Sequence, residues 1–213
     1  MSVASLTKFT VPLPGGGQSN PNQGLLMPKL AYRFRIQFTG FGVGGPKTEL
    51  TKQVMDFTRP QVQFDEVTID VYNSRIKLIG KPAWQDITIN LRDDVTGSVS
   101  KLVGSQLQKQ FDFMEQASAS SGIDYKFTTI CEMLDGGNGN ATGGGPNVLE
   151  TWEIYGCLLS QVQYGELNYG TNDPVKIQLT VKFDNAIQTQ GVAGVGAAIG
   201  RTLNQGATGI TPG

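Results

Sequence analysis

Residues 175–184 read VKIQLTVKFD and carry the clearest structural signal in the chain. Every second side chain is apolar, and the apolar positions are Val175, Ile177, Leu179, Val181 and Phe183. Successive side chains of a strand point to opposite faces, so this alternation predicts a β-strand with one buried face. A strand that buries only one face is typical of an antiparallel sheet.

Four earlier stretches, residues 32–38, 67–71, 87–91 and 127–133, show the same period of two. Parallel strands that are buried on both faces would be continuously apolar instead. The chain is therefore predicted to be mainly β, folded as an antiparallel β-sandwich or small barrel.

Residues 98–116 break the pattern, because their apolar side chains recur every three or four positions. That spacing makes one stripe of an α-helix, formed by Val99, Leu102, Val103, Leu107, Phe111 and Met114. Ser98 or Thr96 is a candidate N-cap, while Gly104 weakens the helix by about 1 kcal/mol relative to alanine. We expect one amphipathic helix lying on the sheets.

The two ends of the chain differ from the middle. Residues 1–29 hold several chain breakers without periodicity, and residues 186–213 repeat glycine in a way that disfavours a helix. We expect an N-terminal extended arm at 1–29, a β-domain at 30–185 and a glycine-rich C-terminal arm at 186–213. Residues 135–146, nearly all turn formers, predict an exposed loop. Residues 53–84 predict long strands that extend beyond what the core of one domain could cover.

Composition argues against several classes of function. A net charge of −1 and a pI near 5.5 provide no basic excess for binding nucleic acid. No stretch approaches the roughly 18 apolar residues needed to span a bilayer. The first residues lack the features of a signal peptide, so we expect folding in a cytoplasm. The sequence has no histidine, which removes the commonest general base and metal ligand.

The sequence shows no catalytic constellation, cofactor motif or set of metal ligands. Asp65 and Glu66 are adjacent, so on a strand they point to opposite faces and cannot form an acid/base pair. Asp93 and Asp94 are interpreted as a turn and helix start, favoured by the helix dipole. The glycine-rich stretches lack both the Lys-Ser/Thr step and the βαβ context of a nucleotide-binding loop.

Cys131 and Cys157 are too few for a disulfide framework, and neither lies in a CxxC motif. In a reducing cytoplasm we expect them to be small buried hydrophobic side chains. A bond formed once the particle leaves the cell is the alternative.

Two longer stretches carry a resemblance to a known family. Residues 72–94 read YNSRIKLIGKPAWQDITINLRDD, where a basic strand is followed by a glycine, an aromatic residue, Ile-Thr-Ile-x-Leu and an acidic end. Residues 151–184 read TWEIYGCLLSQVQYGELNYGTNDPVKIQLTVKFD, where an aromatic-rich strand leads through Tyr-Gly and an Asn/Asp turn to the last alternating strand. In order and spacing, residues 30–184 resemble the tail tube proteins of contractile-tailed (myovirus-type) bacteriophages.

The resemblance implies a structural virion protein without enzymatic activity or cofactor. In that family, hexameric rings stack into the inner tail tube, and long strands of each subunit complete an inner β-barrel around a lumen. Phage DNA passes through this lumen, without specific binding, during ejection into the host. The implied partners are further copies of the chain, the sheath protein, and the baseplate initiator, tape measure and tail terminator proteins, with no membrane. The implied location is the virion tail tube, assembled in the host cytoplasm.

Parts of residues 53–80 and 148–170 are expected to form the inner barrel. The candidate lumen or rim charges are Asp56, Asp65, Glu66, Asp70 and Glu166. The same carboxylates could instead pair with arginine or lysine side chains of a neighbouring subunit. The two arms are expected to contact the ring above or below, or the sheath.

Two alternatives stay open. The first is a protein of the same fold, either a baseplate tube-initiator or the inner tube protein of a related contractile injection or secretion system. The second is a virion decoration or binding module, which predicts an exposed aromatic platform and a stable monomer. Trp84 and Trp152 both lie in strand patterns, which favours core or interface positions for them. An enzyme comes third, because no constellation supports it.

Overall fold

The computed structural model describes residues 5–6, 25–26, 28–43, 48–119, 121–122, 124–135, 147–170, 172–189 and 195. Most of both predicted arms, and residues 136–146 of the predicted loop, lie outside these ranges. The elements are β1 (Ser5–Leu6), β2 (Leu25–Leu26), β3 (Phe34–Thr39), α1 (Thr48–Gln53), β4 (Val54–Phe57), β5 (Val62–Val71), β6 (Ser74–Trp84), β7 (Ile87–Arg92), α2 (Ser98–Gln110), β8 (Phe111–Asp112), β9 (Ala117–Ser118), β10 (Phe127–Leu134), β11 (Val148–Tyr164), β12 (Lys176–Lys182) and β13 (Asn185–Thr189).

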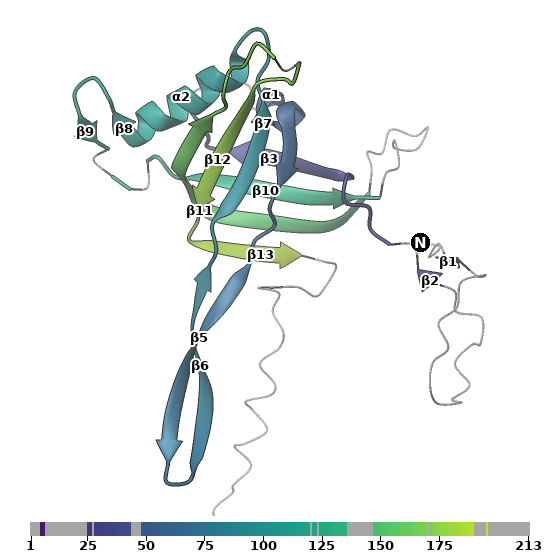
Figure 1. Ribbon diagram of the computed structural model, residues 1–213, viewed down its shortest axis with the longest axis vertical. Coiled ribbons are helices and arrows are strands. Elements are labelled where there is room, and N and C mark those ends of the chain that lie inside the picture. The colour runs from purple at the N-terminus through teal and green to yellow at the C-terminus, as the bar shows by residue number, and fades with distance from the viewer. Residues whose placement is uncertain are drawn as a thin grey trace, which may run out of the picture.

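The main sheet has the strand order β3–β10–β11–β12–β7–β4, and β13 also pairs with β11. Every pairing within it is antiparallel. Figure 1 shows β10 and β13 running across the view while β7 and β12 run steeply upward, so the sheet is folded over on itself. The predicted mainly β, antiparallel fold is confirmed.

β11 belongs to both parts of the folded sheet. Its first half pairs with β10 and β13, and its second half pairs with β12. Gly156 lies between the two halves with a φ of 67°, and a Cβ added there would overlap the Asp184 carboxylate. Since only glycine adopts this φ without strain and leaves this space, Gly156 is where the long strand changes direction.

The core lies between the two parts of the sheet and under α2, and it is built as the alternation predicts. In β7, β10 and β12 every second residue is buried. Each fully buried aliphatic side chain of this kind contributes about 1.5–3 kcal/mol to stability. The most deeply buried members are Phe41, Leu50, Leu91, Val99, Val103, Ile154, Cys157 and Leu179.

The start of α2 is held by the two predicted aspartates. Asp94 accepts hydrogen bonds from the Ser98 N–H at 2.7 Å and from the Ser98 and Thr96 hydroxyls at 2.7 Å each. Asp93 accepts hydrogen bonds from the N–H and the hydroxyl of Ser100. The N-cap residue itself is Gly97, so the expectation of a Ser98 or Thr96 cap is wrong: both hydroxyls donate to Asp94 instead.

The end of α2 comes earlier than predicted. The helix stops at Gln110, and Phe111 is already extended, with a φ of −151°. Phe111 then pairs with Ser118 in the small β8–β9 hairpin. Met114 is 92% exposed, so the last part of the predicted stripe buries nothing that would reward a longer helix.

The prediction of a single helix is also incomplete, because α1 lies between β3 and β4. It is only six residues long, TELTKQ, and Leu50 is its one apolar residue. A helix this short has no periodicity to read, yet Leu50 is fully buried in the core. Its position is therefore set by tertiary packing rather than by local pattern.

Candidate assembly surfaces

The β5–β6 hairpin projects away from the body of the protein (Figure 1). Its strands pair antiparallel through a tight turn at Tyr72–Asn73, where Tyr72 has a φ of 41°. All residues of β5 are exposed. A two-stranded hairpin is at best marginally stable alone in water, and both of its long edges are open among the described strands. The hairpin is therefore exposed to solvent on both faces and at both edges within the described chain.

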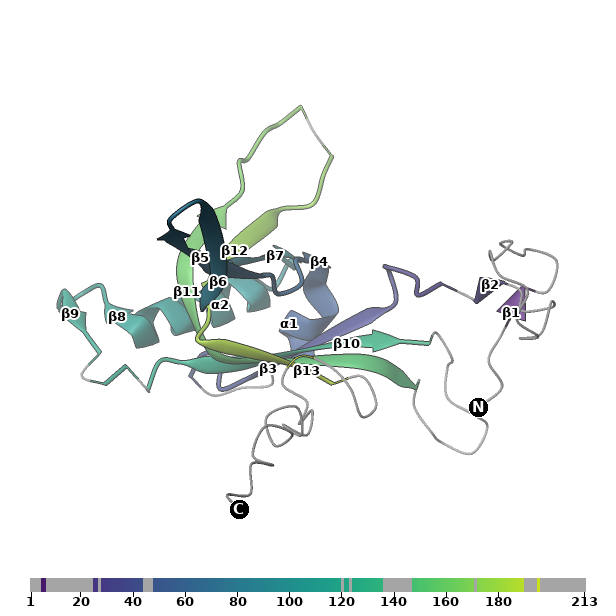
Figure 2. The ribbon, with the colours of Figure 1, turned by 90° about the horizontal axis from the view of Figure 1, so that it is seen from below.

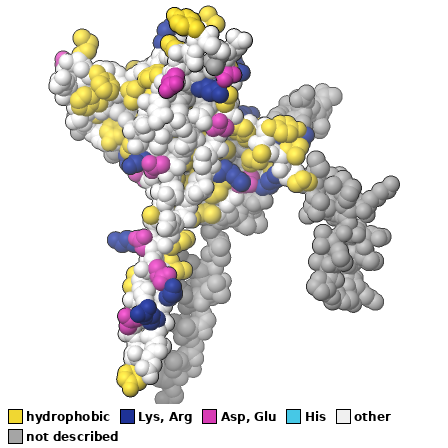
Figure 3. Space-filling model, in the orientation of Figure 1, with side chains coloured by type: hydrophobic (Ala, Val, Ile, Leu, Met, Phe, Trp, Pro, Cys, Tyr) yellow, Lys and Arg dark blue, Asp and Glu magenta, His cyan; other side chains and the backbone are white. Residues whose placement is uncertain are grey.

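The hairpin has one apolar and one charged face. Ile69 lies opposite Ile76, and Val67 lies opposite Leu78, with each of these side chains 45–51% exposed. The sequence correctly predicts a strand at 67–71, but its apolar face packs on no part of the described chain. Figure 3 shows the hydrophobic side chains along the hairpin beside charged ones.

The charged face of the hairpin holds two of the five predicted lumen charges. Glu66 pairs with Lys77 at 2.9 Å, and Asp70 pairs with Arg75 at 2.7 Å. Both pairs are highly exposed, so each adds less than about 1 kcal/mol to stability. Sequence reasoning missed these partners, although a tight turn at Tyr72–Asn73 places residues 70 and 75 directly across from each other.

The other three predicted charges lie elsewhere. Asp65 sits at a register shift in β5, against the backbone of β6 at Gly80. Asp56 is on β4 and accepts a hydrogen bond of 2.7 Å from Asn90. Glu166 lies in the loop between β11 and β12, which Figure 2 shows reaching away from the sheet. The five carboxylates therefore do not form one cluster within a single chain.

The part of the sheet made of β11, β12, β7 and β4 is open at both edges. Among the described strands, β4 pairs with β7 alone, and beyond Leu159 the second half of β11 pairs with β12 alone. At Leu159 a side chain takes the place of a strand: Gln110 donates to the Leu159 carbonyl at 3.0 Å and accepts from its N–H at 2.9 Å. Open edges are strand-pairing sites for another chain.

The face of this four-stranded part that points away from the core is polar, with uncharged rows in its middle and the charged side chains Asp56, Arg92, Lys176 and Lys182 at its margins. The register lines up Gln163, Gln178 and Asn90 in one row across β11, β12 and β7. A second row contains Gln161, Thr180 and Thr88. Cationic side chains, Arg92 and Lys176, sit together at one end of the strands.

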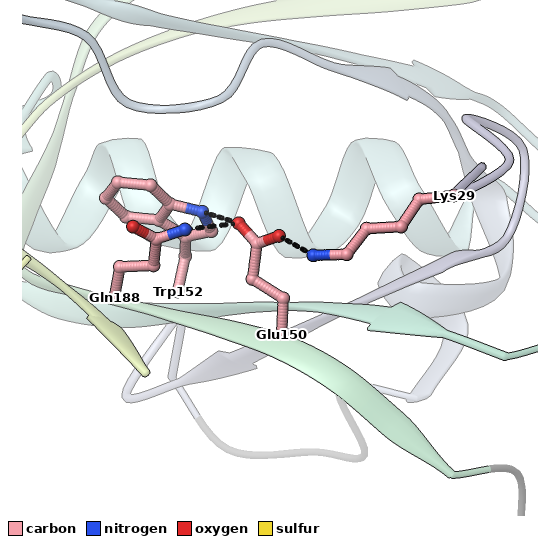
Figure 4. Close-up of polar contacts among 4 residues, drawn as sticks. All are labelled: Lys29, Glu150, Trp152 and Gln188. Atoms are coloured by element: carbon pink, nitrogen blue, oxygen red, sulfur yellow. Dashed lines mark hydrogen bonds and ion pairs between the residues drawn. The ribbon is translucent and has the colours of Figure 1, made fainter. Parts of the chain in front are cut away.

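A buried carboxylate connects the two ends of the described domain (Figure 4). Glu150 on β11 is only 4% exposed and forms an ion pair of 2.6 Å with Lys29. It also accepts hydrogen bonds of 2.7 Å from the Trp152 indole and from the Gln188 amide on β13. Burial alone would raise the pKa of Glu150, but the three donors outweigh it and hold this pKa below its ordinary value.

A groove of about 560 Å³ lies beside Lys29. Its lining comes from β3, β4, β10 and the segments next to β3 and β4, and it includes Phe34, Phe57, Arg59 and Met133. Within the described ranges, no three His, Cys, Asp or Glu side chains are grouped as they would be around a metal ion. No helix there has the length and apolar character needed to cross a membrane.

The two cysteines are free and buried, as predicted. Burial raises the pKa of Cys131 to about 12 and that of Cys157 to about 11. Because the thiolate is the reactive form, neither side chain is a candidate nucleophile or redox site at neutral pH.

Comparison with solved structures identifies the fold. A chain in the cryo-EM structure of the anti-feeding prophage cap, the AFP tube terminating cap, matches with a TM-score of 0.54 and 12% identity, over 88% of this chain and 100% of that one. A chain in the AFP baseplate structure matches with a TM-score of 0.51 and 12% identity, over 77% of this chain and 97% of that one. The chain has the fold of a contractile-tail tube protein.

A third match to this tube fold comes from the sheath/tube terminator of PVC, an extracellular contractile injection system. Its TM-score is 0.50 at 12% identity, over 76% of this chain and 97% of that one. At such identities the likeness is one of fold. No family model matches the sequence, and no curated protein is similar to it. The predicted resemblance to tail tube proteins is confirmed at the level of the fold.

Proposed function

We propose that this chain is a structural subunit of a contractile tail, in which rings of six copies stack to form the inner tube. The observation that carries this proposal is a tube-protein fold whose single chain leaves strand edges unpaired and an apolar face exposed. Within the described residues, the β11–β12–β7–β4 part has two open edges, and the β5–β6 hairpin exposes an apolar face. In an isolated protein, open edges and exposed apolar faces favour aggregation. In an assembly, they are the surfaces that contact neighbouring subunits.

The strand directions are compatible with closure of a ring. Since each pairing from β11 to β4 is antiparallel, β4 runs opposite to β11. A rotation about an axis along the strands keeps these directions, so β4 of one copy meets β11 of the next in antiparallel orientation. Repeating this contact joins all copies into one inner β-barrel and removes the edges.

The hairpin supports stacking of the rings. It continues from β4 and returns into β7, so it extends along the strand direction beyond the end of the four-stranded part (Figure 1). A hairpin that passes the end of its own ring can lay its apolar face on a copy in the next ring. Covering Val67, Ile69, Val71, Ile76 and Leu78 in this way supplies a hydrophobic contact at each subunit.

The lumen is proposed to pass phage DNA without holding it. The rows of glutamine, asparagine and threonine across β11, β12 and β7 offer no line of positive charge that would bind phosphates. Asp56, Asp65, Glu66, Asp70 and Glu166 remain candidates for lumen or rim charges, and weak repulsion from them would keep the duplex off the wall.

Electron microscopy of the purified, untagged protein at high concentration tests this function. The expected result is hollow tubes with sixfold end views. A chain that stays monomeric, and that is also not built into tubes when a tube-initiating complex is added, would contradict it.

A second function of the same class is a tube terminator or initiator, because matching chains come from structures of a cap and of a sheath/tube terminator. Such a protein forms one ring and does not extend. Copy number in the assembled particle separates the two functions. Many rings per particle indicate the tube subunit, and a single ring indicates the terminator or initiator.

A further inference from the structure

We propose that Glu150 couples the two ends of the domain, so that the segment entering β3 and the terminal strand β13 are held or released together. The coupling runs through one carboxylate, which binds Lys29 through one oxygen and Gln188 through the other. This inference concerns the folded single chain and holds whether or not the chain forms a tube.

The burial of Glu150 makes its contacts interdependent. A carboxylate that is 4% exposed has little access to water to replace a lost donor. Removal of one partner of a buried, hydrogen-bonded charge therefore leaves an uncompensated charge that the site must relax to solvate. Because the Gln188 and Trp152 bonds converge on the same group, that relaxation reaches them as well.

Both anchored segments lie at an edge of the main sheet. β13 has five residues and pairs with β11 alone among the described strands. Ahead of β3, Lys29 is followed by a turn in which the Arg33 N–H bonds the Leu30 carbonyl. A short edge strand and a turn of this kind open locally at low free-energy cost, so one strong side-chain contact matters to each.

When two chain segments bind the same side chain, release of one segment weakens the binding of the other. Coupling between two contacts is reciprocal, so pulling Lys29 away weakens Gln188 as much as pulling Gln188 away weakens Lys29. Residues 28 and 189 begin the paths to the two ends of the chain. A partner that engages either end therefore changes how firmly the other is held at its root.

Hydrogen exchange of the full-length protein at neutral pH tests the coupling. In Lys29→Met, the amides of β13 should exchange at least about fivefold faster than in the unsubstituted protein. In Gln188→Leu, the amide of Arg33 should accelerate similarly, although it lies outside β13. Glu150→Gln keeps an acceptor oxygen for Trp152 and Gln188 and leaves no buried charge to be solvated, so β13 should exchange much more slowly in it than in Lys29→Met, although the bond to Lys29 is lost. Lys29→Arg should restore slow exchange, because it restores the charge-assisted bond.

The matched control is Arg35→Met, which breaks another ion pair in the same sheet, Arg35–Glu132 at 2.6 Å. It should leave β13 unchanged. Unchanged β13 exchange in Lys29→Met would overturn the proposal. Equal acceleration in Arg35→Met would also overturn it, because the effect would then be general loosening of the sheet. The double variant Lys29→Met, Gln188→Leu should be less affected than the sum of the two single changes.

Discussion

At the start of α2, a single carboxylate organises the turn that precedes the helix. Hydrogen bonds from Thr96 and Ser98 lower the pKa of Asp94 from 3.8 to about 2. Because the folded-state pKa is the lower one, Asp94 stabilises the fold above about pH 4. That contribution is lost as the pH falls through about 2.

This gives a prediction about acid. An NMR titration should place the Asp94 carboxyl midpoint near pH 2, with the Ser98 amide shift following the same curve. In Asp94→Asn, which keeps an oxygen for the Ser98 N–H but cannot ionise, the Ser98 shift should be flat over this range. A midpoint near 4 in the unsubstituted protein would show that the hydrogen bonds do not stabilise the ionised form.

Gly156 makes a second prediction at the residue scale. Alanine at Gly156 would combine a left-handed φ with overlap on the Asp184 carboxylate, which should cost at least about 2 kcal/mol in denaturant unfolding. Gly97 is the matched control. It has a similar φ of 63° but open space around its Cβ position, so Gly97→Ala should cost only about 1 kcal/mol. Equal costs at the two sites would mean that close packing at the bend of β11 is unimportant.

At the scale of the element, substitutions in the β5–β6 hairpin should affect assembly without affecting the stability of the monomer. Its two faces offer neighbouring cross-strand pairs, Ile69–Ile76 on the apolar face and Thr68–Lys77 on the polar face. Replacing a pair with two asparagines should change monomer stability by less than about 0.5 kcal/mol at either place, because all four side chains are exposed.

Assembly should distinguish the pairs. Losing the two isoleucines removes apolar area that a neighbour would bury, so the concentration needed for tubes should rise more than about tenfold. The polar pair, changed in the same way, should leave it within about threefold. Light scattering as a function of concentration measures both. Normal assembly of the isoleucine variant would show that the apolar face is not an interface.

At the scale of the whole molecule, we expect the charge of the lumen wall to affect the passage of DNA through a tube. Neutralising Asp56, Asp65, Glu66, Asp70 and Glu166 together should leave tubes intact and change the ejection of DNA, if these groups face the lumen. Electron microscopy and an ejection assay read the two effects separately. Loss of assembly would instead show that the carboxylates pair with a neighbouring subunit.

The sequence by itself determined which segments form strands and which face of each strand is apolar. Alternation at residues 87–91, 127–133 and 175–183 predicted strands whose buried and exposed faces are those observed, except that Val175 lies before β12 and is 44% exposed. Those signals are local, because a side chain that faces the core recurs every second position in any strand. The acidic start of α2 was readable for the same reason, since its partners lie within a few residues.

Only the tertiary structure decided which apolar faces are buried and which strand edges are paired. An apolar face looks alike in sequence whether it packs in a core, as in β12, or stands in solvent, as in β5. The open edges, the bend at Gly156 and the side chain of Gln110 at Leu159 follow from which strands lie side by side. The Glu150 site joins residues 29 and 188, which no local pattern connects. Such contacts depend on chain segments brought together from far apart, and local periodicity carries no information about that pairing.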